Sequence, residues 1–438
     1  MATTRRQLGQ AALGVAAIVG LPPSNRRPRS RANILWIMVD DMTRRTLNRM
    51  PHTQDRLVTL GTEFRRGYAA IPLCRPARVS ALQGQYAHNH GEHDNSRRIG
   101  EDTVATRLNA AGYATGYFGK YLNGYQFALK EVPPGWDRWV GTAGTGRRYN
   151  VDGDVRAIGI HPDEYAVGHA DRWITLRPDV PWFAVFAPTN PHAPYTPSRQ
   201  HAHAFDRLPW NPPSFNEADM SDKPTRFRGW ATKNRAEMQA RRNGQLEESL
   251  DVDDQINRLI GALAQTGQLG HTYIFMFSDN GFMFGEHRIF TKQHAYEESA
   301  GIPFVVRGPG VRRGPSNQLV SQVDLMPTAL AIARLDPDAG RVLDGRSMLT
   351  QLRSGDWSDW RKRLLVEHPA KNWAMTCEGN LRYIHHHAAD EEELYDLALD
   401  VHQMDSIHAE RNTTRLRART TALRQGSGRA LRAIEMEP

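Results

Sequence analysis

The sequence has little cysteine and no long hydrophobic run. Its 438 residues include only two cysteines, Cys74 and Cys377, too few for a disulfide framework in a chain of this length. No apolar stretch approaches the ~20 residues that a helix needs to cross a bilayer, so no stable membrane span is expected. The length instead predicts a globular protein with one large domain and a smaller one, and either cysteine is left open for a chemical role.

Acidic residues are absent from the first 31 residues, and this absence explains most of the net charge. The formal charge is +8, and six of these positive charges come from Arg5, Arg6, Arg26, Arg27, Arg29 and Arg31. The rest of the chain is therefore close to neutral. Its composition does not indicate binding to nucleic acid.

Residues 1–31 have the pattern of an export signal with a linker. The pair Arg5-Arg6 precedes a short, weakly apolar stretch at 11–21, which Pro22-Pro23 follows. An arginine pair before such a stretch is typical of signals for the twin-arginine export machinery. A disordered basic tail is the alternative. We expect an exported protein, either secreted or periplasmic or held at the cell surface.

Apolar runs of strand length alternate with helical patterns between residues 32 and 335. The runs lie at 33–39, 182–187, 273–277 and 303–306, and the helical patterns at about 102–111, 235–265 and 323–334. Runs without a polar face are typical of strands that helices cover on both sides. This order predicts an α/β domain with a mostly parallel sheet between helices, interrupted by a long surface loop at 196–234.

The pattern changes after residue 335. Short strand candidates lie at 364–366, 372–375 and 381–384, and a final helix is expected at 413–425. These elements predict a small C-terminal α+β subdomain, residues 336–438, with an antiparallel sheet.

Two of the apolar runs end in residues whose oxygens can bind a cation. Asp40 and Asp41 follow the first run, and Asp279 and Asn280 follow the run at 273–277. Either pair alone is more often a turn or a helix cap. Ligands of open α/β sheets gather at the carboxyl ends of strands, however, so the two pairs together indicate a metal site.

The segment Cys74-Arg75-Pro76-Ala77-Arg78 has the C-x-P-x-R pattern at which cysteine is oxidised to formylglycine. Pro76 suits the first turn of a helix, which places Cys74 at the helix N-terminus. Backbone N–H groups and the helix dipole favour an anion there. A buried structural cysteine is the alternative interpretation.

Together these segments resemble the sulfatase family, whose usual form of the cysteine motif is CSPSR. The resembling segments are NILWIMVDD (33–41), CRPAR (74–78), GYFGKYLNGY (116–125), NPHAPY (190–195), SDNG (278–281) and ELYDL (393–397). They span about residues 32–410. The resemblance implies an alkaline-phosphatase-like α/β core and a sulfuric ester hydrolase that a formylglycine-generating enzyme modifies.

The resemblance also implies roles for individual residues. Those that would bind the metal are Asp40, Asp41, Asp279, Asn280 and the formylglycine made from Cys74. Hard oxygen ligands favour Ca²⁺, and Mg²⁺ fits less well. One hydroxyl of the hydrated aldehyde would attack sulfur, and the other would later release sulfate by reforming the aldehyde.

The other catalytic groups are implied in the same way. Lys120 and Lys292 would hold sulfate oxygens, and Arg78 would steady the nucleophile. Asp279 would act as the base on the diol, and His192 would contact sulfate or protonate the leaving group.

One position departs from the family pattern. Many arylsulfatases carry a histidine two residues after the lysine at position 120, where this chain has Leu122. The segments GKYLNGY and VPPGWD (132–137) resemble instead the branch with N-acetylglucosamine-6-sulfatases and extracellular heparan sulfatases. We therefore expect a sulfated sugar or glycosaminoglycan fragment as substrate, with a 6-sulfated glucosamine as one candidate. Trp136, Trp139 and Tyr195 are candidates for stacking on sugar rings.

Two alternatives stay open from the sequence. The first keeps the fold and changes the ester, giving a phosphonate monoester hydrolase or phosphodiesterase. The second is a non-catalytic sugar-binding protein of the same fold, which would follow if Cys74 were never oxidised. If Cys74 is converted to formylglycine, Cys377 has no thiol partner at position 74, and no disulfide is expected.

Overall fold

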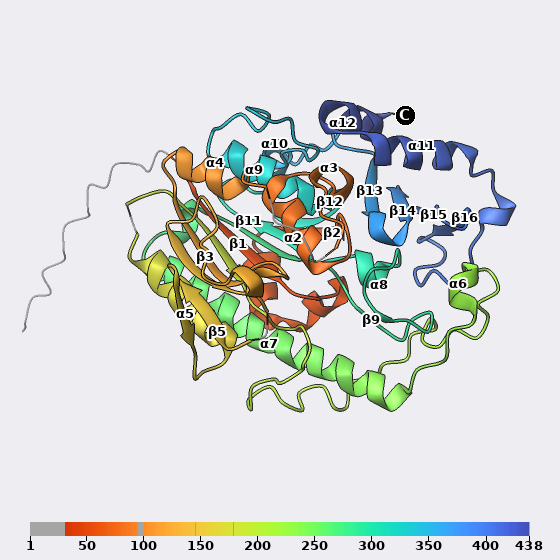
Figure 1. The fold of residues 1–438 in the computed structure, drawn as a ribbon, viewed down its shortest axis with the longest axis horizontal. Coiled ribbons are helices and arrows are strands. Elements are labelled where there is room, and N and C mark those ends of the chain that lie inside the picture. The colour runs from red at the N-terminus through yellow and green to blue at the C-terminus, as the bar shows by residue number, and fades with distance from the viewer. Residues whose placement is uncertain (1–30, 95–99, 145, 178, 438) are drawn as a thin grey trace, which may run out of the picture.

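The computed structural model describes residues 31–94, 100–144, 146–177 and 179–437, so nearly all of the segment with the export pattern lies outside the described residues. The chain forms an α/β unit around a ten-stranded sheet and a smaller C-terminal unit around a four-stranded sheet (Figure 1). The predicted fold class, a mostly parallel sheet with a separate antiparallel one, is confirmed.

The centre of the large sheet consists of the strands that the apolar runs predicted. In spatial order these are β8 (Thr272–Ser278), β1 (Asn33–Val39), β7 (Trp182–Ala187) and β3 (Ala114–Lys120), all parallel. Every residue of β1, β7 and β8 is buried. Alternate side chains of β1 enter opposite cores, with Trp36 on one side and Ile37 on the other. Two-sided burial explains why these strands have no polar face.

Helices cover both faces of this sheet. One face packs against α2 (Cys74–Gln83), α4 (Val104–Ala110) and α9 (Leu325–Ile332). The other packs against α5 (Pro162–Thr175) and the long α7 (Arg235–Gln265) (Figure 1). The bounds of α7 are those predicted from the sequence.

The margins of the large sheet differ from a purely parallel arrangement. On one side lie β11 (Phe304–Arg307), β2 (Thr62–Tyr68) and β12 (Gly314–Ser321), and on the other β4 (Arg138–Thr142), β5 (Arg148–Val151) and β6 (Asp154–Ala157). β11 runs antiparallel to β8, and β4, β5 and β6 form an antiparallel meander. The meander was not predicted because its outer strand is polar and largely exposed.

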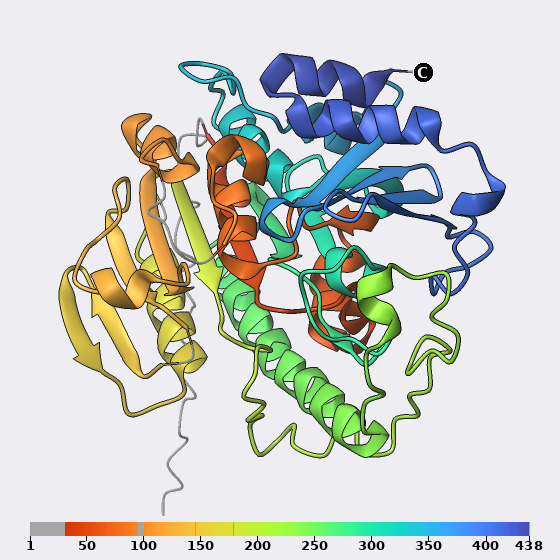
Figure 2. The ribbon, with the colours of Figure 1, turned by 45° about the vertical axis from the view of Figure 1, so that its right-hand side comes forward.

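The C-terminal unit contains an antiparallel sheet of four strands. In spatial order these are β13 (Arg363–His368), β14 (Trp373–Glu378), β15 (Leu381–His386) and β16 (Glu391–Asp396). Figure 2 shows α11 (Thr414–Gln425) and α12 (Gly428–Met436) lying over it. Leu343, Met348 and Leu352 pack into the core of the α/β unit. These residues follow the predicted domain boundary at residue 336 but pack with the unit before it. The boundary therefore stays a prediction.

The loop at 196–234 contains only the short helix α6 (Thr225–Arg228) between turns. The remaining short elements are η1 (Arg44–Arg49), α1 (Pro51–Thr53), η2 (Gln54–Val58), α3 (Ala87–His90), η3 (Tyr125–Ala128), η4 (Leu269–His271), β9 (Met283–Phe284), β10 (Phe290–Thr291), α8 (Glu297–Ala300), η5 (Gln322–Asp324), α10 (Leu349–Ser354), η6 (Pro369–Lys371) and η7 (His408–Glu410). Among the described residues, no helix combines the length and apolar character needed to cross a membrane.

A buried carboxylate joins the two sheets. Glu297 of α8 accepts hydrogen bonds from Tyr68 at the end of β2 (2.6 Å) and from Arg382 of β15 (3.0 Å). Its second oxygen pairs with Arg44 of η1 at 2.9 Å. Burial would raise the pKa of Glu297, but the two arginines and the tyrosine hydroxyl outweigh it and lower the pKa from 4.5 to about 2.

We expect Glu297→Gln to remove pH-dependent stability. A lowered pKa stabilises the fold above the unfolded value of 4.5, and this contribution is lost as the pH falls from 4.5 toward 2. The difference in free energy of unfolding between the parent and the variant should be about 3 kcal/mol at pH 7 and shrink toward zero in that window. Urea unfolding at several pH values measures it, with the exposed Glu410→Gln as control. A difference that stays constant down to pH 3 would contradict the assignment.

Candidate active site

The predicted metal ligands lie at two adjacent strand ends. Val39 is in register with Ser278 in the parallel pair β1–β8, so Asp40 and Asp279 leave the same edge of the sheet. The backbone N–H of Asp41 donates to Asp279 Oδ1 at 3.1 Å, and Asn280 Nδ2 donates to Asp41 Oδ1 at 2.6 Å. The strand-end argument from the sequence thus places all four side chains together.

Cys74 is the first residue of α2 and faces this group of carboxylates. Its Sγ lies 3.4 Å from Asp40 Oδ1 and 3.8 Å from Asp41 Oδ1. Lys292, just after β10, places Nζ 2.7 Å from the same sulfur and also pairs with Asp41. Burial is the main cause that raises the pKa of the Cys74 thiol. An unmodified Cys74 is therefore a neutral thiol and a poor nucleophile at neutral pH.

Arg78 lies one turn further along α2 and ties the site together. Its Nε donates to Asp279 Oδ2 at 2.8 Å, and one terminal nitrogen donates to the carbonyl of Lys120 at 2.8 Å. The side chain of Arg78 is fully buried. A buried guanidinium with two such partners fixes both the end of β3 and the carboxylate after β8.

The surroundings of Asp40 and Asp279 shift the pKa values of these two carboxyl groups in opposite directions. Burial would raise the pKa of Asp40, but Lys120 at contact distance, with other cations, holds it well below its usual range. Burial and the charge of Asp40 raise the pKa of Asp279 to about 6. Asp279 is thus the carboxylate best suited to accept a proton near neutral pH.

Ligand atoms suited to a cation converge at the same place. One ligand atom each from Asp40, Asp41, Cys74 and His192 lie within 4.8 Å of one another. The buried Oδ1 of Asn280 has no hydrogen-bond partner among the described residues. Two carboxylates and an orphaned amide oxygen are a donor set that fits a hard cation such as Ca²⁺.

Asp279 lies beside this group of ligand atoms rather than within it. Its two oxygens are occupied by Arg78 and by the backbone N–H groups of Asp41 and Asn280. His192, in contrast, turns Nε2 toward Asp41 at 3.6 Å, and its side chain is 32% exposed. The site therefore opens on the side of His192 and Lys292, since the other catalytic candidates are buried.

Three supporting residues were not predicted from the sequence. Gln322 of η5 donates to the carbonyls of Ser278 (2.8 Å) and Asp279 (2.6 Å) and accepts from the N–H of Ala70 at 3.0 Å. Gln245 of α7 donates to the carbonyl of Asp41 at 2.9 Å. Ser278 itself bonds to the backbone on both sides of the Asp40–Asp41 turn. These buried polar groups fix the strand ends. Ser278 lies in the SDNG segment, but no sequence motif marks Gln245 or Gln322.

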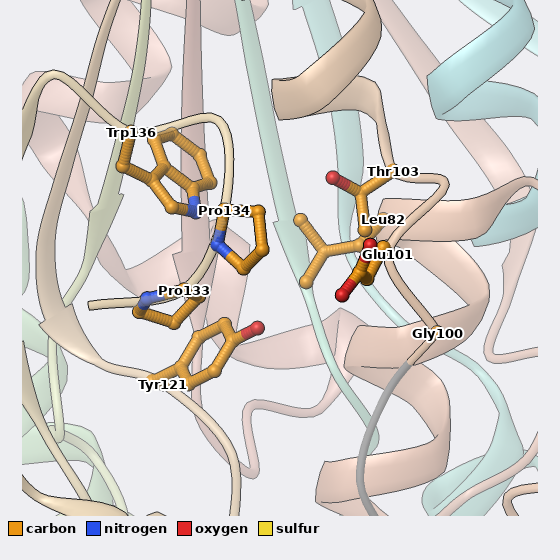
Figure 3. Close-up of a pocket in the computed structure, with 8 residues that line it drawn as sticks. All are labelled: Leu82, Gly100, Glu101, Thr103, Tyr121, Pro133, Pro134 and Trp136. Carbon is orange, nitrogen blue, oxygen red and sulfur yellow. The ribbon is translucent and has the colours of Figure 1, made fainter. Parts of the chain in front are cut away.

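Of the two tryptophans proposed to stack on sugar, Trp139 is in the wrong place, and the prediction is corrected for this residue. Trp136 is partly buried. Trp139 is fully buried, and its indole N–H donates to Tyr125 at 2.8 Å. Trp136 borders a cavity of about 30 Å³, opposite Leu82 at the far end of α2 (Figure 3). That volume is too small for a sugar ring. Both tryptophans belong to an aromatic core cluster, which apolar packing alone explains.

Tyr195 and Leu122 have different surroundings. Tyr195 lies in the loop after His192, where the charges of Asp41 and Lys292 act on its hydroxyl. It stays a candidate for contact with substrate. Leu122, at the position of the missing histidine, is buried in the apolar core.

Comparison with known proteins decides the family. The sulfatase family model matches residues 32–335, more than half of the chain. The chain belongs to the sulfatase family. A second model, described as the C-terminal part of N-sulphoglucosamine sulphohydrolase, matches residues 285–425. The α/β unit is thus the alkaline-phosphatase-like core that the resemblance implied.

Relatives that are described as sulfatases agree with this membership, and a solved structure shares the fold. A Sulf-1 homologue of Caenorhabditis elegans is 32% identical over 73% of this chain and 49% of its own length. Human N-acetylglucosamine-6-sulfatase is 29% identical over 83% of this chain and 71% of its own. A solved structure described as a complex with its substrate D-glucosamine-2-N,6-O-disulfate has a TM-score of 0.76, with 23% identity over 90% of this chain and 97% of that one. The chain thus spans about half of the length of the nematode relative.

Proposed function

We propose that this member of the sulfatase family hydrolyses sulfate monoesters with a formylglycine at position 74. The observation that carries the proposal is the position of Cys74. It begins α2 and lies within 3.8 Å of two strand-end aspartates and in contact with Lys292. A hydrated formylglycine there would supply the hydroxyl that attacks sulfur and would release sulfate by returning to the aldehyde.

The side chains around position 74 suit each part of this reaction. Lys120 and Lys292 keep positive charge and would bind sulfate oxygens, stabilising the charge that develops as the S–O bond breaks. Arg78 would hold Asp279 in place, and Asp279 would accept a proton from the nucleophile. His192 donates Nδ1–H to the carbonyl of Ala193, and when protonated it can donate from Nε2 to the leaving oxygen.

The donor set supports Ca²⁺ as the resident ion, with Mg²⁺ less suited. Asp40, Asp41, Asn280 and the group at position 74 would hold it, and Asp279 would join them by turning one oxygen from its backbone partners. A bound Ca²⁺ would offset the charge of sulfate and polarise the sulfur.

The substrate that we propose is a sulfated amino sugar, with 6-sulfated glucosamine as the leading candidate. The named activity of the human relative supports this, together with the GKYLNGY and VPPGWD segments. We further propose that a formylglycine-generating enzyme modifies Cys74 and that the twin-arginine machinery exports the protein.

Turnover of matched esters tests the proposed function. We expect 6-sulfated glucosamine to be cleaved with a higher kcat/KM than aryl sulfates, and sulfate esters faster than an aryl phosphonate monoester or a phosphate diester. Sulfated galactose serves as the control for the position of the sulfate. A sulfate ester turned over most slowly of all would instead favour the phosphonate hydrolase alternative, and no turnover would favour a sugar-binding protein.

A further inference from the structure

A cleft lies at the junction of the two sheets. Its volume is about 370 Å³, within the range of about 300–1,000 Å³ that is usual for small-molecule sites. One wall is β12, the edge strand of the large sheet, and the other is the segment 357–362 with the turn after β14. The indole N–H of Trp360 donates to the carbonyl of Leu319 at 2.7 Å and joins the two walls. None of the catalytic candidates lines this cleft.

The cleft and the active site lie at opposite ends of β14. At the first residue of this strand, the indole N–H of Trp373 donates to the carbonyl of Gln293 at 3.1 Å, next to Lys292. At the other end, Glu378 and Gly379 line the cleft. The ends of a six-residue strand are about 17 Å apart. A ligand in the cleft would therefore not touch the reacting atoms.

β12 has an irregularity where it lines the cleft. Between Ser316 and Leu319 its register with β2 shifts by one residue, as in a β-bulge. Consecutive side chains of a regular strand point to opposite faces, yet Asn317, Gln318 and Leu319 all line the cleft. Neither amide side chain has a hydrogen-bond partner among the described residues, since Gln318 uses only its backbone N–H. The bulge thus leaves two amide groups available to a ligand.

Trp357 provides an aromatic surface in the same cleft. Its half-buried ring packs edge to face with Phe64 and Trp360, with centroids 5.4 and 5.1 Å apart. The rest of its surface lines the cleft, and its indole N–H has no partner within the described parts of the chain. A ring held in this way can pack against the C–H face of a pyranose while its N–H binds a hydroxyl.

Two cations at the cleft have no carboxylate partner among the residues that the structure describes. Lys362 is exposed and forms no ion pair there. Arg66 donates to the side-chain oxygen of Asn380 at 2.5 Å, which is a neutral partner. Glu378 also lines the cleft, but it already pairs with two arginines. The cleft therefore keeps an excess of positive charge.

We propose that this cleft binds a sugar unit that carries a sulfate or a carboxylate, apart from the catalytic centre. Trp357 would pack against the sugar ring, and the amides of Asn317 and Gln318 would bind its hydroxyls. Lys362 and Arg66 would bind the acidic group through charge-assisted hydrogen bonds. The ligand is an acidic pyranose, either free or within a glycan chain. The proposal goes beyond the proposed function, because binding here does not depend on turnover.

Calorimetry with three matched tetrasaccharides tests the cleft. The probes are cellotetraose, cellotetraose sulfated at C6, and the same tetramer oxidised to a uronate at C6. Every protein carries Lys292→Gln, which weakens binding of sulfate at the active site. We expect at least one acidic probe to bind about fivefold more tightly than cellotetraose, the upper end of what an exposed ion pair contributes. Lys362→Gln should remove most of this difference.

Two further variants complete the series. Trp357→Ala should weaken binding of all three probes about tenfold, because the stacking surface serves charged and neutral rings alike. The exposed Lys130→Gln should bind every probe as its parent does. Thermal melting of each variant checks the fold, since Trp357 also packs against the core. Lys362→Gln changes only an exposed side chain, so its result is independent of that packing.

The outcomes separate the cleft from the proposed function. Equal affinity for neutral and acidic probes would overturn the proposal, and so would an acidic preference that survives in Lys362→Gln. The probe that gains affinity identifies the acidic group as a sulfate or a carboxylate. None of these measurements uses turnover, so their failure leaves the proposed hydrolysis of sulfate esters standing, and a failure of that hydrolysis leaves the cleft standing.

Discussion

Cys74→Ala should reduce sulfate ester turnover by about 10⁴-fold or more, the usual consequence of removing a catalytic nucleophile. The other groups of the site would keep their positions without the sulfur, because Arg78 binds Asp279 and the carbonyl of Lys120. Lys120 pairs with Asp40, and Lys292 pairs with Asp41. Steady-state kinetics on the best sulfated sugar measures the loss. Retained turnover would contradict the mechanism.

Two matched variants separate the chemistry from the packing of a buried cysteine. Cys377 in β14 is also fully buried and free, so Cys377→Ala should lower stability and leave kcat/KM nearly unchanged. Cys74→Ser keeps a hydroxyl but lacks the second one needed for release. We expect it to give at most a single turnover, detectable by mass spectrometry as a sulfated peptide containing residue 74.

Removal of calcium should have the second-largest effect. Chelation should reduce turnover by about 10³-fold, since a metal that offsets charge in the transition state contributes several kcal/mol. The melting temperature should also fall, because a ligand at about 1,000 times its Kd stabilises the fold by about 4 kcal/mol. Ca²⁺ should restore both properties, and Mg²⁺ should restore them less well.

The thermal shift also tests the ligand set independently of activity. In Asp40→Asn the melting temperature should no longer respond to Ca²⁺, whereas the exposed Asp356→Asn should respond as the parent does. If chelation changed neither melting nor turnover of dialysed protein, the site would not be a calcium site.

The predictable parts of the fold are the strands whose residue types are determined by burial on both faces. β1, β7 and β8 are buried on both faces, so their sequences contain little but apolar residues. The polar residues after β1 and β8 then had to lie at a common edge. In contrast, β6 is a polar strand that only its neighbour β5 stabilises, and no local pattern distinguishes it from a turn.

The site was predictable where a residue acts through its own chemistry and not where it acts through the backbone of others. Cys74 and Arg78 lie in a motif, whereas Gln245 and Gln322 are ordinary glutamines until their carbonyl partners are known. For Trp139 the sequence instead predicted a functional role that the structure does not support. An aromatic residue near a sugar-enzyme motif indicated ligand stacking, yet its N–H bond to Tyr125 and its neighbours show a core residue.

The burial of Cys74 has a consequence for the order of events during synthesis. Cys74 is 1% exposed, so its thiol is out of reach of any modifying enzyme once α2 has packed against the sheet. On the proposed function, oxidation must therefore come before folding and compete with it in time. Fast-folding molecules would escape conversion, so the active fraction of a preparation would depend on how quickly the chain folds as much as on how much modifying enzyme is present.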